Sequence, residues 1–278
     1  MTSVTQRVKQ VTQPRGGYIN PRTMEIRYLD GDSPAPVDHK TENIHASLVG
    51  MAVDYLTRLA NGTEPQDAFA ISLRGAELLG TALFNRAMSD VRSLTAGRVD
   101  TAAIATACRL AGYDVAFRAG PRVYNPDAQT TPDATTTQHI AVMVDRSLAF
   151  FREYGPTALD GFTFEGGYTN TVSTGDGDFL TANTLWDFKV SVAGPTSAHT
   201  LQLLMYYIMG KRSIHPEFST ITRLGVFNPR LNAVYLLPVS TVPAETIAEV
   251  ARDVIGYTSR AVSYRAPAQP TLPHTNPL

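Results

Sequence analysis

The sequence predicts an α/β protein in which a layer of helices precedes a region of mixed strands and helices. Apolar residues recur at helical spacing from 41 to 120, and a loop rich in threonine and proline follows at 124–137. From 138 onward, strand-like alternation is interleaved with helical periodicity. The chain has 278 residues, 43% of them apolar, which is enough for one large domain or two modest ones. This composition excludes disordered, collagenous and coiled-coil proteins.

Charge and cysteine content exclude several classes of partner and cofactor. The chain has 24 basic and 25 acidic residues, so its net charge of -1 gives no general attraction to nucleic acid, although residues 1–27 are locally basic. The one cysteine, Cys108, lies in an apolar run and is expected to be buried. A single cysteine rules out an intrachain disulfide, a cysteine-rich zinc site and a four-cysteine iron–sulfur cluster.

No part of the sequence has the character of a membrane segment. A span needs roughly 18 to 20 consecutive apolar residues, and no window approaches this. The first ten residues have no apolar stretch of the kind found in a secretory signal. We therefore expect a cytoplasmic location and no membrane partner.

The N-terminal part divides into an arm and a helical layer. Residues 1–40 have turn signals around one strand-like run at 24–29, so we expect an irregular basic arm with little core of its own. The helical layer is expected over 41–123. Its helices are predicted at 42–60, 64–97 and 99–120, with Asn61-Gly62 as a stop signal and further breaks at glycines.

The region 138–262 is predicted as the α/β core. In chain order it reads as a helix, three strands, a helix, two strands and a helix. The helices are expected at 139–155, 196–210 and 244–260, and the strand-like segments at 161–168, 168–173, 177–181, 184–191, 223–229 and 232–239. The remaining residues, 263–278, contain four prolines and are expected to be a flexible tail.

An acidic residue and a lysine share one face of the strand at 184–191. Period-two alternation puts Asp187 and Lys189 on that face and two aromatic residues on the other. Burying these charges unpaired would be costly, so they need a partner, solvent, or a metal ion with its substrate. Asp178 heads the preceding short strand, and a hairpin through 182–183 would place it beside Asp187. Two carboxylates and a lysine would then converge.

This set of side chains is suited to metal-assisted chemistry. Two carboxylates are ligands for a hard divalent ion, Mg²⁺ or Mn²⁺, which acidifies water and offsets charge on a phosphoryl oxygen. A nearby ammonium group can orient the water or stabilise negative charge in the transition state. On the following helix, His199, Gln202 and Tyr206 share one face that can point at the same end of the hairpin. The pattern indicates phosphodiester hydrolysis.

The arrangement resembles the RecB-like branch of the PD-(D/E)xK nuclease superfamily over about residues 138–240. GDGD at 175–178 is similar to the family's G-x-x-D, DFK at 187–189 to (D/E)xK, and QLLMY at 202–206 to Q-x-x-x-Y. The resemblance implies a restriction-endonuclease-like core, which is a mixed central sheet flanked by helices. It also implies a Mg²⁺-dependent or Mn²⁺-dependent nuclease that cleaves DNA, with a protein partner that supplies targeting or helicase activity.

The resemblance also assigns roles to individual residues. Asp178 and Asp187 would hold the metal ion, with the Phe188 carbonyl as a third ligand, and Lys189 would be the catalytic lysine. Gln202 and Tyr206 would steady the site or contact DNA. The family often adds a Glu or His from an upstream helix, and the sequence leaves this choice open among Glu42, His45, His139, Asp145, Glu153 and Glu165.

The sequence leaves other interpretations open. Gly177 stands where the family has proline, and a second acid-x-Lys triplet, Asp38-His39-Lys40, lies in a turn-rich stretch. Asp178 can be a turn residue, and Asp187 can form an ordinary ion pair with Lys189 on an edge strand. The first alternative function is an inactive nuclease-fold module that binds nucleic acid or scaffolds a larger DNA-processing or defence complex. The second is an unrelated α/β binding protein in which the triplet is accidental.

Overall fold

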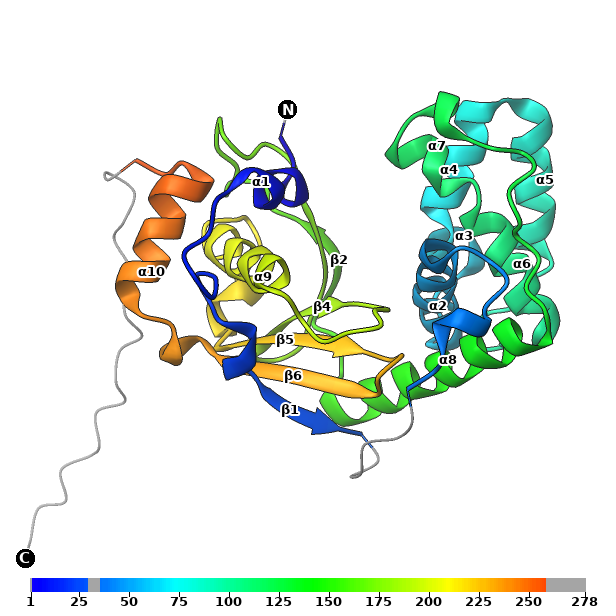
Figure 1. The fold of residues 1–278 in the computed structure, drawn as a ribbon. Coiled ribbons are helices and arrows are strands. Elements are labelled where there is room, and N and C mark those ends of the chain that lie inside the picture. Colours follow the sequence, from blue (N-terminus) through cyan, green and yellow to red (C-terminus); the bar gives the residue numbers. More distant parts are fainter. Residues whose placement is uncertain (1, 30–35, 259–278) are drawn as a thin grey trace, which may run out of the picture.

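The structure is a computed structural model that describes residues 2–29 and 36–258. The predicted tail at 263–278 lies outside the described residues. The described chain forms a sheet lobe and a helical lobe, and helix α8 (Ala134–Tyr154) runs along both of them (Figure 1). The predicted α/β class is confirmed. No helix in the described ranges is long and apolar enough to cross a membrane.

The sheet has six strands in the order β1-β6-β5-β4-β3-β2. All neighbouring strands are antiparallel except β4 and β5, which are parallel. Helix α9 (Ser197–Gly210) makes the crossover between these two strands, as parallel pairing requires. The strands are β1 (Glu25–Tyr28), β2 (Leu159–Thr163), β3 (Asp176–Leu180), β4 (Thr184–Phe188), β5 (Arg223–Asn228) and β6 (Ala233–Pro238).

The two faces of the sheet carry different cores. On one face, Leu185 belongs to a large cluster with the buried residues of α9. On the other face, Trp186 belongs to an aromatic cluster with Phe150 of α8, whose ring centroid is 4.8 Å away. Leu185 and Trp186 are adjacent in β4, so the predicted period-two alternation of this strand is confirmed.

The N-terminal arm is better ordered than the sequence analysis predicts. Helix α1 (Val4–Gln10) begins at a capping box between Ser3 and Gln6, and it packs against α9 (Figure 1). Val4 and Val8, one turn apart, are buried in the core of the sheet lobe. The strand-like run becomes β1, which pairs with β6 at the sheet edge. The expectation of an irregular arm is wrong for α1 and β1, and the buried residues of α1 join the core of the sheet lobe rather than a core of their own.

The helical lobe has its own core, to which α8 contributes. Met143 and Val144 of α8 are buried among the residues of this lobe, whereas Phe150 of the same helix packs under the sheet. Asp133 caps the start of α8, so the helix begins five residues before the predicted 139. The other helices are α2 (Ala46–Ala60), α3 (Pro65–Ala68), α4 (Ala70–Leu79), α5 (Thr81–Arg92), α6 (Thr101–Ala111) and α7 (Asp114–Arg118).

The strand-like segment at 168–173 does not form a strand. The hydroxyl of Thr169 accepts hydrogen bonds from the backbone N–H groups of Thr171 and Val172, which closes a local turn. Three strands therefore lie between α8 and α9, as the predicted order requires. After β6, helix α10 (Ala244–Glu249) continues as a π-helical segment, Val250–Ile255, and ends at Gly256, whose φ of 91° is left-handed.

Candidate functional site

The β3–β4 hairpin brings the two predicted carboxylates together. Phe179 pairs with Trp186, so the next pair in the same register is Asp178 with Asp187. The backbone N–H of Phe188 donates to Oδ2 of Asp178 at 2.6 Å. Because the N–H and C=O groups of a strand residue point to the same edge, the Phe188 carbonyl also faces the Asp178 side. The predicted hairpin through 182–183 is therefore present, with Thr181 and Thr184 joined across it.

Asp187 is enclosed, and only one of its oxygens has a partner. Lys189 Nζ donates to Oδ1 at 2.8 Å, and Gln202 Nε2 contacts the same oxygen at 3.4 Å. Gln202 also donates to the hydroxyl of Tyr206 at 2.8 Å. Oδ2 of Asp187 is buried and has no hydrogen-bond partner in the described structure. A buried carboxylate oxygen without a donor is costly, and a cation would offset that cost.

Electrostatics single out Asp178. Burial and the neighbouring charge of Asp187 raise the pKa of Asp178 to about 7, against the opposing effects of Lys189 and the Phe188 N–H. Burial alone would lower the pKa of Lys189, but the carboxylates of Asp187 and Asp178 outweigh it, and the net shift is upward. Lys189 therefore stays protonated while the carboxylates repel each other.

Helix α9 supplies the back of the site. Gln202 and Tyr206 are both buried, and burial raises the pKa of Tyr206 well above its ordinary value. Gln202 contacts Asp187 directly, and Tyr206 contacts Gln202, so the two side chains support the position of Asp187. His199 lies near the same charges: burial and Lys189 lower its pKa. Of the predicted stripe of three polar residues, Gln202 contacts the hairpin directly.

A cleft of about 250 Å³ opens between the two lobes at this point. Asp178, Phe188 and Lys189 line its sheet side. The helical side is formed by α2 and by the last residue of α7, with Ala46, Ser47, Gly50, Met51, Asp54, Tyr55 and Arg118. Lys189 keeps 28% of its side chain exposed, whereas Asp187 keeps 1%. Asp178 and Lys189 are therefore open to a ligand in the cleft, and Asp187 stands behind them.

Sequence reasoning missed the residues that α2 and α7 bring to this cleft. Asp54 adds to the negative potential that raises the pKa of Asp178. Arg58, one turn later, contacts Asp54 at 3.3 Å and Asp160 of β2 at 2.9 Å, and so joins the two lobes. A signal was present in the sequence, because Ser47, Gly50, Asp54 and Arg58 form a small and polar stripe on an otherwise apolar helix.

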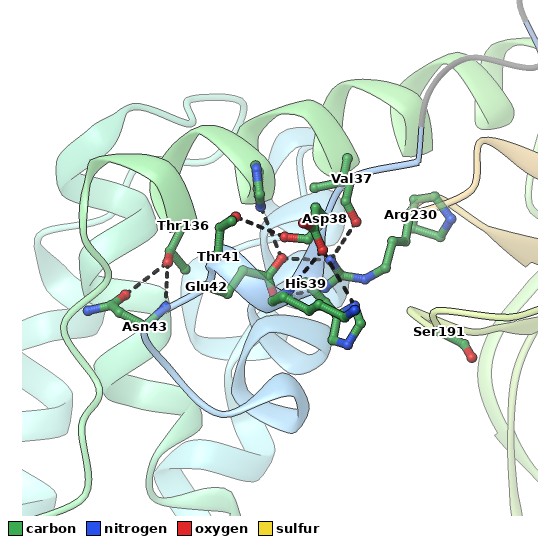
Figure 2. A network of polar contacts seen from close by, with 12 residues as sticks. Val37, Asp38, His39, Thr41, Glu42, Asn43, Thr136, Ser191 and Arg230 are labelled. Carbon is green, nitrogen blue, oxygen red and sulfur yellow. Dashed lines mark hydrogen bonds and ion pairs between the residues drawn. The ribbon is translucent and has the colours of Figure 1, made fainter.

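Two of the six upstream candidates belong to a structural network. Glu42 and Arg230 are each 2% exposed, and the guanidinium contacts both carboxylate oxygens at 2.6 and 3.0 Å (Figure 2). His139 of α8 contacts the same carboxylate at 3.2 Å. Arg230 lies in the β5–β6 turn, so this network ties the start of the helical lobe to the sheet.

The other four candidates also lie outside the lining of the cleft. His45 caps α2 and contacts Ser47. Asp145 and Glu153 are exposed on α8. Glu165 follows β2 and accepts a hydrogen bond from Thr163. Of these, His45 is nearest in the chain to the lining residues.

The second triplet and the cysteine have structural explanations. Asp38 caps a short helical turn at His39–Thr41 and accepts from the backbone N–H of Lys40, so this triplet is part of a capped turn rather than a strand. Cys108 is fully buried in the helical lobe, and burial raises its pKa to about 12. The expectation that it is a small buried apolar residue is confirmed.

The donor set suits a hard divalent cation. In the described residues no group of three or more His, Cys, Asp or Glu side chains is placed to hold a metal ion. Two carboxylates nevertheless suffice for Mg²⁺, which prefers oxygen ligands and keeps several waters. The unpartnered oxygen of Asp187 and the repulsion between Asp178 and Asp187 are what a cation would relieve.

Comparison of the chain with models of known protein families, with curated proteins and with solved structures found no match.

Proposed function

We propose that this protein is a metal-dependent nuclease that hydrolyses DNA phosphodiester bonds at the cleft between its two lobes. One observation carries the proposal: a buried oxygen of Asp187 lacks a hydrogen-bond partner, and the carboxylate of Asp178 on the paired strand is near enough for the two charges to repel each other. Packing alone does not favour two repelling carboxylates at one end of a hairpin, whereas a divalent cation does.

The fold is consistent with the proposal. The order of one helix, three antiparallel strands, a crossover helix and a parallel strand agrees with the restriction-endonuclease-like core that the sequence resemblance implies. Asp178 and Asp187 lie at the end of the central hairpin, and the crossover helix α9 places Gln202 behind them. Residues from the three sequence motifs therefore lie close to one another.

In the proposed reaction, Asp178 and Asp187 hold Mg²⁺ or Mn²⁺, and the Phe188 carbonyl is on the side where it can join them. The bound ion supplies positive charge next to a phosphoryl oxygen and makes a nearby water more acidic. Lys189 lines the cleft and stays protonated, so its ammonium group can orient the attacking water and stabilise the negative charge that develops on the phosphate. Gln202 and Tyr206 keep Asp187 in one orientation.

The test is a cleavage assay with the full chain. Linear and circular DNA are incubated with protein in Mg²⁺, in Mn²⁺ and in chelator, and the products are separated by size. We expect metal-dependent cutting that Lys189→Ala and Asp187→Asn each reduce by at least about 100-fold, because Lys189 would stabilise the developing negative charge and Asp187 would hold the ion. The chain offers a matched control in Lys40→Ala, which removes the lysine of the other acid-x-Lys triplet and should cut as the wild type does.

Two results would contradict the proposal. Cutting that survives Lys189→Ala at full rate would place the active site elsewhere. DNA binding without cutting in either metal would favour the inactive nucleic-acid-binding module.

A further inference from the structure

Arg118 reaches the cleft from the lobe opposite the carboxylates. It is the last residue of α7, in the helical lobe, yet it lines the same cleft as Asp178 and Lys189. Asp176, two residues before Asp178 on β3, lies within electrostatic range of its guanidinium. A cation of the helical lobe therefore faces acidic residues of the sheet lobe across the cleft.

A buried carboxylate holds Arg118 in place. Asp114, one turn earlier on α7, is fully buried, and its Oδ2 lies 3.6 Å from Nε of Arg118. Ser72 donates to Oδ1 of Asp114 at 2.6 Å, and the hydroxyl of Tyr55 donates to Oδ2. Tyr55 also interacts with the guanidinium of Arg118. The ion pair with Asp114 therefore helps to fix the position of the Arg118 side chain.

The position of α7 is also fixed by close packing. A Cβ added at Gly75 of α4 would lie 2.1 Å from the carbonyl oxygen of Tyr113, so α4 approaches the start of α7 as closely as a glycine allows. Asp114 begins α7 directly after Tyr113. Arg118 therefore projects from a rigid element, which is what a binding residue requires.

Exposure separates Arg118 from the other cations around the cleft. Its side chain is 53% exposed, against 28% for Lys189 and 27% for Arg58. Lys189 contacts Asp187, and Arg58 contacts Asp54 and Asp160. Arg118 is thus the most exposed of these three cations to a ligand entering the cleft. A planar guanidinium that is half exposed matches a phosphate group.

We propose that Arg118 binds a backbone phosphate of the DNA strand that enters the cleft, and so positions the strand against the carboxylates of the sheet lobe. This inference rests on the proposed function, because it takes DNA as the ligand. It adds a binding residue on the lobe that the sequence motifs do not reach.

The test is equilibrium DNA binding, measured by fluorescence anisotropy of a labelled duplex in chelator over a series of salt concentrations. We expect Arg118→Gln to weaken binding about tenfold, as the loss of one charge-assisted contact does. The slope of log affinity against log salt should fall by about 0.9, because one phosphate contact is lost. Arg118→Lys should keep the wild-type slope and lose only part of the affinity. The matched control is Arg74→Gln, which changes an exposed arginine of α4 outside the cleft lining and should alter neither quantity.

The outcomes separate this inference from the nuclease proposal. Arg118→Gln with wild-type affinity and salt slope would overturn the inference, even where the wild type cuts DNA. A raised KM for cutting with an unchanged kcat would support it. Metal-independent binding that depends on Arg118, in a protein that cuts no DNA, would support the inference while the nuclease proposal fails. Circular dichroism of each variant verifies folding, and Arg118→Lys keeps the test valid if Arg118→Gln unfolds.

Discussion

Asp178 and Asp187 place two negative charges at one end of a hairpin, and Asp178 lines the cleft together with the ammonium group of Lys189. Burial and mutual repulsion disfavour the ionised form of Asp178, as its raised pKa of about 7 records. A group that is harder to ionise in the folded state than in the unfolded chain reduces stability once the pH rises above its unfolded pKa. The two carboxylates therefore repel each other in the folded protein, and a bound cation would reduce this repulsion.

This repulsion predicts a stabilising substitution. In chelator, Asp178→Asn should raise the melting temperature at neutral pH by a few degrees, since roughly 2–4 °C corresponds to 1 kcal/mol in a chain of this size. The wild type should lose stability as the pH rises from about 4, near the unfolded pKa of an aspartate, to about 7, and the variant should lose less. Thermal melts across this pH range measure the difference. Equal pH dependence in both proteins would contradict it, and added Mg²⁺ should stabilise only the wild type.

At the scale of elements, a buried ion pair connects segments that are far apart in the chain. Glu42 precedes α2 and pairs with Arg230 of the β5–β6 turn (Figure 2). His139 of α8 also contacts Glu42. Each charge is enclosed, so each depends on its partner for compensation. This explains why Glu42 and His139, which fit the pattern of an upstream catalytic residue, are placed away from the cleft.

Removing one member of the pair should therefore cost more than removing both. Glu42→Gln should lower the free energy of unfolding by about 3–5 kcal/mol, because Arg230 is left with a buried and uncompensated charge. The double variant Glu42→Leu with Arg230→Met should recover most of this loss. Urea unfolding measures both values. A Glu42→Gln cost below about 1 kcal/mol would mean that the network is not a structural link.

At the scale of the whole molecule, α8 makes the two lobes depend on each other. Its first half completes the helical core through Met143, and its second half packs Phe150 under the sheet. Arg58 adds an ion pair between the lobes at the cleft. Because one continuous helix packs into both lobes, it helps to fix the position of one side of the cleft relative to the other.

The shared helix predicts cooperative unfolding. Met143→Ala, a change in the helical core, should cost about 2–5 kcal/mol and should lower the midpoint measured by fluorescence of Trp186, the only tryptophan, which lies in the sheet lobe. The midpoint from far-UV circular dichroism, which reports the helices, should fall by the same amount. The exposed Gln138→Ala on the same helix is the control. A fluorescence midpoint that stays at the wild-type value while the dichroism midpoint falls would mean that the lobes unfold separately.

Local periodicity was enough to predict much of the site. The alternation in β4, the hairpin that pairs Asp178 with Asp187, and the polar stripe on α9 all follow from the spacing of neighbouring residues. The same local signals were insufficient for the arm, where the docking of Val4 and Val8 depends on α9 almost two hundred residues later.

The sequence alone determined which side chains share a face of one strand or one helix, because backbone geometry sets that period within a few residues. Only the tertiary structure decided what stands opposite the carboxylates. Asp54 and Arg118 face them because α2 and α7 pack into a separate lobe whose position is set by α8 and by the Glu42–Arg230 pair. Contacts of that kind join residues about a hundred or more positions apart, and no local pattern encodes them.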